Sequence, residues 1–137
     1  MKNGPAIVIT CDTHVLLYWV ADPQQLSLTA AEALRVGRTE DALGCADIVL
    51  WEIAMLATKR RISLPMPINQ FIEDLLQSLH LTVVPISSAI AVRAQDTVFQ
   101  HKDPADRLIA ATAMELDAPL ITADGKLAQV AGLRVLW

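Results

Sequence analysis

Short runs of apolar residues alternate along the chain with longer stretches in which apolar residues recur at helical spacing. The first short run, at residues 6–11, is continuous and rich in β-branched residues, which is typical of a strand buried on both faces of a parallel sheet. Together the short runs predict five strands, at residues 6–11, 42–46, 81–86, 120–123 and 133–136. Strands that alternate with helices in this way predict an α/β fold, a three-layer α/β/α sandwich on a mostly parallel sheet.

The longer stretches predict the helices. They cover residues 14–20, 30–36, 48–59, 68–79, 88–98, 105–116 and 124–130. The clearest apolar face belongs to the stretch 68–79, which either packs against the sheet or forms a dimer surface. We expect Thr13 and Asp47 to cap the first and third helices, and Gly37 to end the second.

Composition and charge narrow the class of protein. Of the 137 residues, 53% are hydrophobic, and the mean hydropathy of +0.39 excludes a disordered chain. This length fits one core, so we expect residues 1–137 to form a single globular domain. Eleven Lys and Arg residues against fifteen Asp and Glu residues give a net charge of −4, which argues against nucleic-acid binding through bulk positive charge.

The cysteines and the length of the apolar runs bear on the cellular compartment. Cys11 and Cys45 lie in apolar surroundings without the spacing of a zinc site or a disulfide framework, which favours a reducing cytoplasm. Acidic residues interrupt the apolar stretches before they reach the roughly 18 residues of a membrane span. We therefore expect a cytoplasmic protein without a membrane anchor.

Four acidic residues stand where the predicted fold would place a binding site. They lie just after a strand or within the first turns of a helix, and they are Asp12, Glu52, Asp106 and Asp124. Ligands of open parallel sheets bind beyond the carboxyl ends of the strands. Each acid alone also has an ordinary explanation, as a turn or cap residue or, for Glu52, as the partner of Arg107 in a salt bridge.

Taken together, these carboxylates predict a metal site. Four of them at one sheet edge would repel one another and raise their pKa values unless a divalent cation neutralised them. Carboxylates without His or Cys partners suit Mg²⁺ or Mn²⁺. Such a cation lowers the pKa of a bound water and stabilises the charge that develops on a phosphodiester. The residues therefore favour metal-assisted phosphodiester hydrolysis.

Four motifs give the sequence a resemblance to a known family. The motifs are CDTHVLL at 11–17, LWEIA at 50–54, DPADRLIAATA at 103–113 and LITAD at 120–124. In order and spacing they resemble PIN-domain proteins and, more narrowly, the VapC-type toxins of bacterial toxin–antitoxin modules. The resemblance implies a PIN-like fold and a Mg²⁺- or Mn²⁺-dependent endoribonuclease. Such toxins are usually homodimers and are inhibited by a cognate antitoxin that covers the acidic site.

The resemblance also implies roles for individual positions. The matches to the three core acids, the more variable fourth acid and two neighbouring hydroxyls are Asp12, Glu52 and Asp106, then Asp124, then Thr13 and Thr122. The run before Glu52 departs from the pattern, because related sequences often carry Ser or Thr hydroxyls where this chain has Ala, Asp, Ile and Val at 46–49. Asp47, within that run, either caps its helix only or also adds negative charge near the metal.

Positive side chains are the expected partners of RNA phosphates. The densest basic run is Lys59, Arg60 and Arg61, which either contacts phosphate or is the solvated end of a helix. The basic residues near the acidic motifs are His101, Lys102, Arg107 and Lys126. Arg107 is the strongest candidate for a phosphate contact, because it is adjacent to Asp106.

The sequence predicts structural roles for His14 and Trp51. His14 follows the first acidic motif, but we expect it to pack or to hydrogen-bond, since a water activated by a metal needs no histidine base. Trp51 is expected in the core. The three tryptophans are not spaced as platforms for stacking bases.

Two rival functions stay open. One is a Mg²⁺-dependent phosphotransfer domain with Asp12 as the phosphorylated nucleophile, although His14 stands where a haloacid-type phosphatase loop has a second Asp. The other is a non-catalytic module whose acidic cluster recognises a basic segment of a partner. A covalent aspartyl phosphate would identify the first, and a lack of Mn²⁺ binding would identify the second.

Overall fold

The computed structural model describes residues 6–96, 98–99 and 103–137, and within them five strands form one parallel sheet. The strands are β1 (Ile9–Cys11), β2 (Leu43–Ala46), β3 (Thr82–Val84), β4 (Leu120–Ile121) and β5 (Val135–Leu136), in the order β3-β2-β1-β4-β5. Thr10 of the central strand pairs with Gly44 of β2 on one side and with Leu120 of β4 on the other. The predicted parallel sheet is confirmed, with each strand shorter than predicted.

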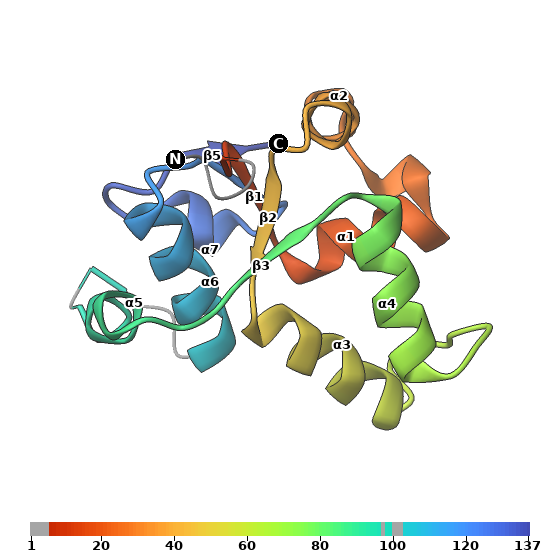
Figure 1. Cartoon of the computed structure of the whole chain (residues 1–137). Helices are drawn as coiled ribbons and strands as arrows, with labels where there is room; N and C mark the ends of the chain where they lie inside the picture. The colour runs from red at the N-terminus through yellow and green to blue at the C-terminus, as the bar shows by residue number, and fades with distance from the viewer. Residues whose placement is uncertain (1–5, 97, 100–102) are drawn as a thin grey trace.

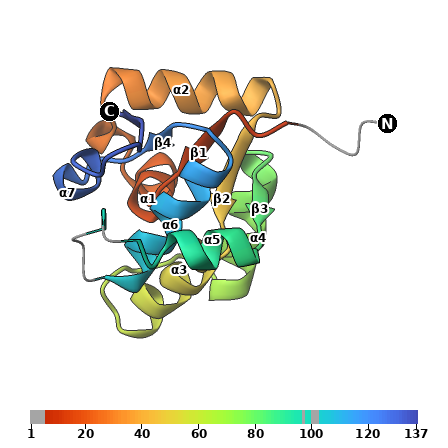
Figure 2. The same ribbon diagram turned by 90° about the vertical axis from the view of Figure 1, so that its left-hand side faces the viewer.

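Helices cover both faces of this sheet. They are α1 (Thr13–Ala21), α2 (Leu28–Thr39), α3 (Ile48–Thr58), α4 (Ile68–Ser78), α5 (Ser88–Arg93), α6 (Pro104–Glu115) and α7 (Gly125–Ala128), with a 3-10 turn at Pro23–Gln25. Figure 1 shows α5, α6 and α7 on one side of the strands and α1, α2 and α4 on the other, with α3 below. In Figure 2, which is turned by 90°, α5 and α6 lie in front of the strands. The predicted α/β/α sandwich is confirmed.

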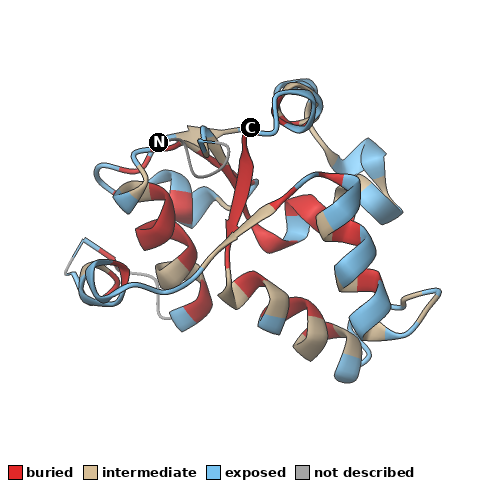
Figure 3. Ribbon diagram, in the orientation of Figure 1, coloured by how far each residue is buried: buried red, intermediate tan, exposed pale blue. Residues whose placement is uncertain are grey.

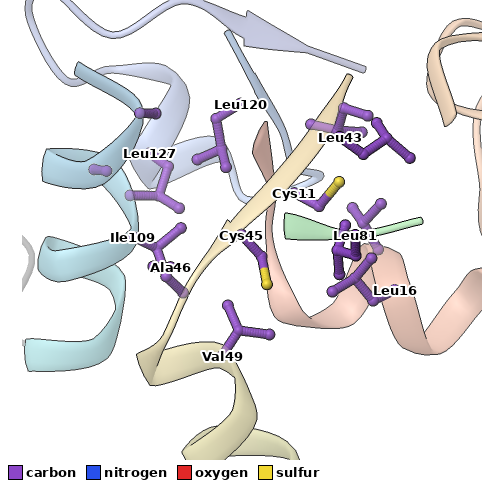
Figure 4. Close-up of a cluster of buried hydrophobic side chains, with 14 of the residues drawn as sticks. Cys11, Leu16, Leu43, Cys45, Ala46, Val49, Leu81, Ile109, Leu120 and Leu127 are labelled. Carbon is purple, nitrogen blue, oxygen red and sulfur yellow. The ribbon is translucent and has the colours of Figure 1, made fainter. Parts of the chain in front are cut away.

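The core lies on both sides of the central strands. All four residues of β2 are buried, as the red strand in Figure 3 shows. In Figure 4, Ile109 and Leu127 lie on one side of this strand, and Leu16 and Leu81 lie on the other. Complete burial of a leucine or isoleucine side chain contributes about 1.5–3 kcal/mol. Side-chain packing on both faces therefore holds the layers together although the strands are short.

The cysteines belong to this core and are not cross-linked. Cys11 and Cys45 are free and buried, as the absence of a disulfide pattern predicts. Burial raises the pKa of the Cys45 thiol to about 12, and it raises the pKa of Cys11 as well. Both thiols are therefore protonated and unreactive in the folded protein.

Two apolar helices differ in how they are covered. Phe71 and Leu75 of α4 are buried, so the apolar face of this helix packs within the molecule. The prediction that Trp51 is a core residue is wrong, because its side chain is 59% exposed on α3. Helix α3 is apolar on all sides, and only the side with Val49 and Ile53 is buried.

Among the described residues, no helix is both long and apolar enough to cross a bilayer.

The first helix begins one residue earlier than predicted. Asp12 occupies the N-cap position of α1, and its Oδ1 accepts a hydrogen bond of 2.7 Å from the backbone N–H of Thr13. Thr13 is the first residue of the helix, so the prediction that it is the cap is wrong. The helix ends at Ala21, before Pro23, as the proline predicts.

Two other predicted helix ends are wrong because of contacts with residues outside the helices. Gly37 lies inside α2, where a Cβ atom would overlap the buried side chain of Leu43, so the glycine permits close packing of the helix on β2. Asp47 precedes α3 in a helical conformation without capping it. Its Oδ2 instead accepts a hydrogen bond of 3.1 Å from the backbone N–H of Ile86.

Helix α5 is shorter than predicted and ends at Arg93. The residues that follow form a turn, and the carbonyl of Ala94 accepts a hydrogen bond of 2.8 Å from Nε of Arg107. This bond draws the end of α5 against α6.

Candidate metal site

The sheet topology brings acidic side chains from four segments to one edge. Asp12 follows β1, Glu52 lies in α3 after β2, Asp106 lies in the first turn of α6, and Asp124 follows β4. All four line a pocket of about 340 Å³. Its lining residues are Asp12, His14, Val15, Tyr18, Glu52, Asp103, Asp106, Ala123 and Asp124.

Three of these acids form a compact group. Asp12, Glu52 and Asp106 each offer one carboxylate oxygen, and the three oxygens lie within 4.8 Å of one another. Asp12 and Glu52 are buried, with 7% and 8% exposed, and Asp106 is half-buried. Asp124 lines the same pocket outside this group, and its Oδ1 accepts a hydrogen bond of 2.8 Å from the backbone N–H of Lys126.

Two buried threonine hydroxyls hold the carboxylates in place. Thr13 Oγ1 donates to Oε1 of Glu52, and Thr122 Oγ1 donates to Oδ2 of Asp12 at 2.6 Å. Thr122 Oγ1 also accepts a hydrogen bond of 3.1 Å from the backbone N–H of Asp124. Each hydroxyl therefore fixes the orientation of a carboxylate from behind and leaves its other lone pairs for a ligand.

Burial and like charges raise the pKa values of the two buried acids. For Asp12, burial is the largest cause, the bonds from Thr122 and Thr13 oppose it, and the charge of Asp124 adds to it. For Glu52, burial is again the largest cause, the bond from Thr13 opposes it, and the charges of Asp12 and Asp103 add to it. Ionisation of both acids is therefore less favourable than in water, and a positive charge beside them would make it more favourable.

The arrangement fits a hard divalent cation. The three oxygens come from carboxylates, which are ligands that Mg²⁺ and Mn²⁺ prefer, and softer metals would favour histidine or cysteine ligands. A bound cation would also offset the burial and repulsion that raise the pKa values of Asp12 and Glu52.

Sequence reasoning missed three residues of this pocket. Asp103 is the N-cap of α6, where its Oδ1 accepts a hydrogen bond of 2.9 Å from the N–H of Ala105, and it lines the acidic pocket as well. The sequence could have indicated this position, because Asp103 caps the helix whose first turn carries Asp106, and both carboxylates therefore lie at the same helix end. His14 is exposed and lines the pocket with Tyr18 rather than packing in the core.

The predicted phosphate-binding residues lie in different places. Arg107 lines a separate pocket of about 380 Å³ between α5 and α6. Glu52 accepts a hydrogen bond from Thr13 and does not form the salt bridge with Arg107 that was one interpretation of the sequence. The exposed residues Lys59, Arg60 and Arg61 follow the last turn of α3. Lys59 is about 10 Å along the helix axis from Glu52, at 1.5 Å per residue.

The other basic candidates for RNA contact are Lys126, His101 and Lys102. Lys126 is exposed on α7, two residues after Asp124. His101 and Lys102 lie outside the described residues.

The fold and the pocket define a class of α/β proteins that gather carboxylates at the carboxyl edge of a parallel sheet to hold a divalent cation. Comparison with protein families matches residues 9–133 to the PIN domain. The chain belongs to the PIN-domain family.

Individual relatives agree with this membership. The chain is a homologue of Ribonuclease VapC22 from Mycobacterium tuberculosis, with 37% identity over 120 residues that cover 87% of this chain and 88% of the relative. VapBC2 from Rickettsia felis, solved with a DNA fragment from its promoter, matches the fold with a TM-score of 0.70 and 16% identity over 94% of this chain and 97% of the solved one. A toxin–antitoxin complex from Klebsiella pneumoniae matches with a TM-score of 0.63 and 22% identity over 91% and 94%.

Proposed function

We propose that the protein is a metal-dependent endoribonuclease that acts as the toxin of a toxin–antitoxin module. The observation that carries this proposal is the group of oxygens from Asp12, Glu52 and Asp106 within 4.8 Å of one another. The name of the homologous ribonuclease supports RNA as substrate, and the toxin–antitoxin neighbours support the biological setting.

The residues of the pocket have different proposed roles. Asp12, Glu52 and Asp106 hold Mg²⁺ or Mn²⁺, and Asp124 completes the acidic edge. When bound, the cation supplies positive charge that acidifies water and stabilises the charge developing on the phosphodiester. Thr13 and Thr122 keep two carboxylates in a fixed orientation, so that little reorganisation is needed during the reaction.

Two observations argue against the phosphotransfer alternative. The chain matches the PIN domain over residues 9–133, and His14 stands where a haloacid-type phosphatase loop has a second Asp. The hydrogen bonds from Thr13 N and Thr122 Oγ1 fix the Asp12 carboxylate and leave a lone pair on each oxygen for a metal.

We also propose the partners of the protein. RNA phosphates would contact the exposed Lys59, Arg60, Arg61 and Lys126, and Arg107 would contact them only from its separate pocket. A cognate antitoxin would cover the acidic pocket with a basic side chain, because the pocket carries five carboxylates. Residues 1–137 would act as one domain within a cytoplasmic homodimer. Exposed Trp51 offers apolar surface to either protein partner.

Cleavage of a single-stranded RNA in Mg²⁺ or Mn²⁺ tests the proposal. Asp106→Asn should lower kcat by more than about 100-fold, since even residues behind a ligand contribute about 10- to 100-fold. Asp74→Asn is the matched control, because Asp74 is exposed on α4. RNA left intact by the native protein, or cut equally by the Asp106 variant, would contradict the proposal. Failure to bind Mn²⁺ would favour the non-catalytic acidic module.

A further inference from the structure

One wall of the acidic pocket is aromatic. His14 and Tyr18 are four residues apart on α1 and therefore lie on the same face of the helix. Their ring centroids are 6.3 Å apart and the rings are inclined at 50°. Rings at this distance and angle do not cover each other, so each keeps an open face. His14 is exposed and Tyr18 is half-buried, which places ring surface at the pocket rather than in the core.

Apart from the two rings, the apolar side chains among the described residues that line the pocket are Val15 and Ala123. The described residues that line the pocket include five carboxylates and neither Lys nor Arg. A phosphate is held at such a pocket only through a cation, because the carboxylates repel it. The binding energy for the rest of the nucleotide must come from another part of the wall.

We propose that His14 and Tyr18 form a stacking surface for the nucleobase next to the scissile phosphate. The inference rests on the proposed RNA cleavage and adds the part of the substrate that these two rings recognise. Every base has a flat π-face, so stacking on an aromatic side chain is strong and tolerates different sequences. The tryptophans cannot serve this purpose, because the pocket lining contains none of them.

The position of the rings links stacking to the chemistry. His14 comes two residues after Asp12 and one residue after Thr13, which bonds Glu52. The helix that begins with the cap carboxylate therefore carries the ring surface over the same pocket. A base stacked there fixes the adjacent phosphate beside the three carboxylate oxygens.

Kinetics with modified RNA test this proposal. The substrate is an RNA oligonucleotide with one cleavage site, and two further oligonucleotides carry an abasic nucleotide immediately 5′ or 3′ of that site. For the native protein we expect one abasic substrate to raise KM by about tenfold or more, as stacking energies imply. Tyr18→Leu and His14→Leu should raise KM for the intact RNA by about tenfold, keep kcat within about threefold, and abolish the difference between intact and abasic RNA.

Matched variants separate stacking from stability. Tyr18→Phe keeps the ring and should behave as the native protein, and Trp137→Leu removes an exposed aromatic side chain that does not line the pocket and should also behave as the native protein. Equal KM values of Tyr18→Leu, His14→Leu and the native protein for intact RNA would overturn the inference while RNA cleavage stands. A loss shared by Tyr18→Phe would overturn it too, because it would assign the role to the hydroxyl. A native protein that cuts none of the RNAs would instead refute the proposed function.

Discussion

The buried carboxylates depend on individual hydroxyl groups. Thr122 Oγ1 donates to Asp12 and accepts from the backbone N–H of Asp124, so one side chain orients a metal-binding acid and the loop that carries another. A residue of this kind acts through its neighbours, and its loss disturbs the site more than the core.

Thr122→Val is therefore expected to weaken Mn²⁺ binding and RNA cleavage by about 10- to 100-fold. Valine has the shape of threonine but removes the donor to Oδ2 of Asp12 and the Oγ1 acceptor of the Asp124 N–H. Calorimetric titration with Mn²⁺ and cleavage rates would measure the effect. Thr122→Ser, which keeps the hydroxyl, should stay close to the native values, and equal metal affinity of the valine variant would refute the role.

The raised pKa values of Asp12 and Glu52 predict how pH affects the metal-free protein. The folded state binds protons at these residues more tightly than the unfolded state does. The resulting stabilisation is complete below the ordinary carboxyl pKa, about 4, and is lost as pH rises through the raised values. Asp12→Asn should therefore gain stability relative to the native protein as pH rises from about 4 to 7.

Urea denaturation in EDTA at several pH values would measure this gain. Asparagine suits the experiment because its oxygen can still accept from Thr13 N, whereas alanine would lose a helix cap worth about 0.5–2 kcal/mol. Mn²⁺ should stabilise the native protein more than the variant. A stability difference that does not change with pH would show that burial does not raise the pKa of Asp12.

At the scale of elements, the contact between α2 and β2 depends on a glycine. Gly37→Ala should reduce the free energy of unfolding by up to about 2 kcal/mol. Overpacking costs about 1–3 kcal/mol, and it outweighs the gain of about 1 kcal/mol in helix propensity. The added Cβ would overlap Leu43, which is fully buried, so the leucine side chain would have to shift within the core. In a Leu43→Ala background, the same change should be neutral or stabilising, and a loss of equal size there would contradict the explanation.

The same glycine shows what sequence patterns do and do not reveal about elements. The β-branched runs and the acids that follow them predicted the strands and the shared edge, because period and order determine topology. Gly37 resembled a helix end, and only the position of Leu43 in space explains why the helix continues. Asp47 resembled a cap, but its carboxylate bonds Ile86, 39 residues away.

The candidate site shows the same limit. Asp12, Glu52 and Asp124 were predictable from their positions after strands, whereas the direction of Arg107 depends on its bond to the carbonyl of Ala94. The ring surface of His14 and Tyr18 was also hidden, because a helical face of apolar and aromatic residues resembles a core face in sequence. Side-chain direction, which the period does not give, accounts for these misses.

At the scale of the whole molecule, the acidic pocket explains the net charge. The four proposed site acids formally equal the net charge of −4, so the remaining surface is close to neutral. RNA should therefore bind weakly to the metal-free protein, with at least about a tenfold gain in affinity when Mn²⁺ is present. Filter binding of RNA in EDTA and in Mn²⁺, sampled before cleavage has proceeded, would measure both states. Equal affinity in EDTA and in Mn²⁺ would show that the basic residues bind RNA without help from the site.

The central place of β1 also bears on how the protein is made in a cell. The backbone N–H of Thr10 donates to the carbonyl of Pro119, and that of Asp12 donates to the carbonyl of Ile121, so the first strand is held by one of the last. The third acid and the hydroxyl behind Asp12 also come from the second half of the chain, at Asp106 and Thr122. A ribosome that releases the chain before residue 120 therefore releases a product without an assembled site. A product that ends before residue 120 would therefore lack the proposed ribonuclease activity.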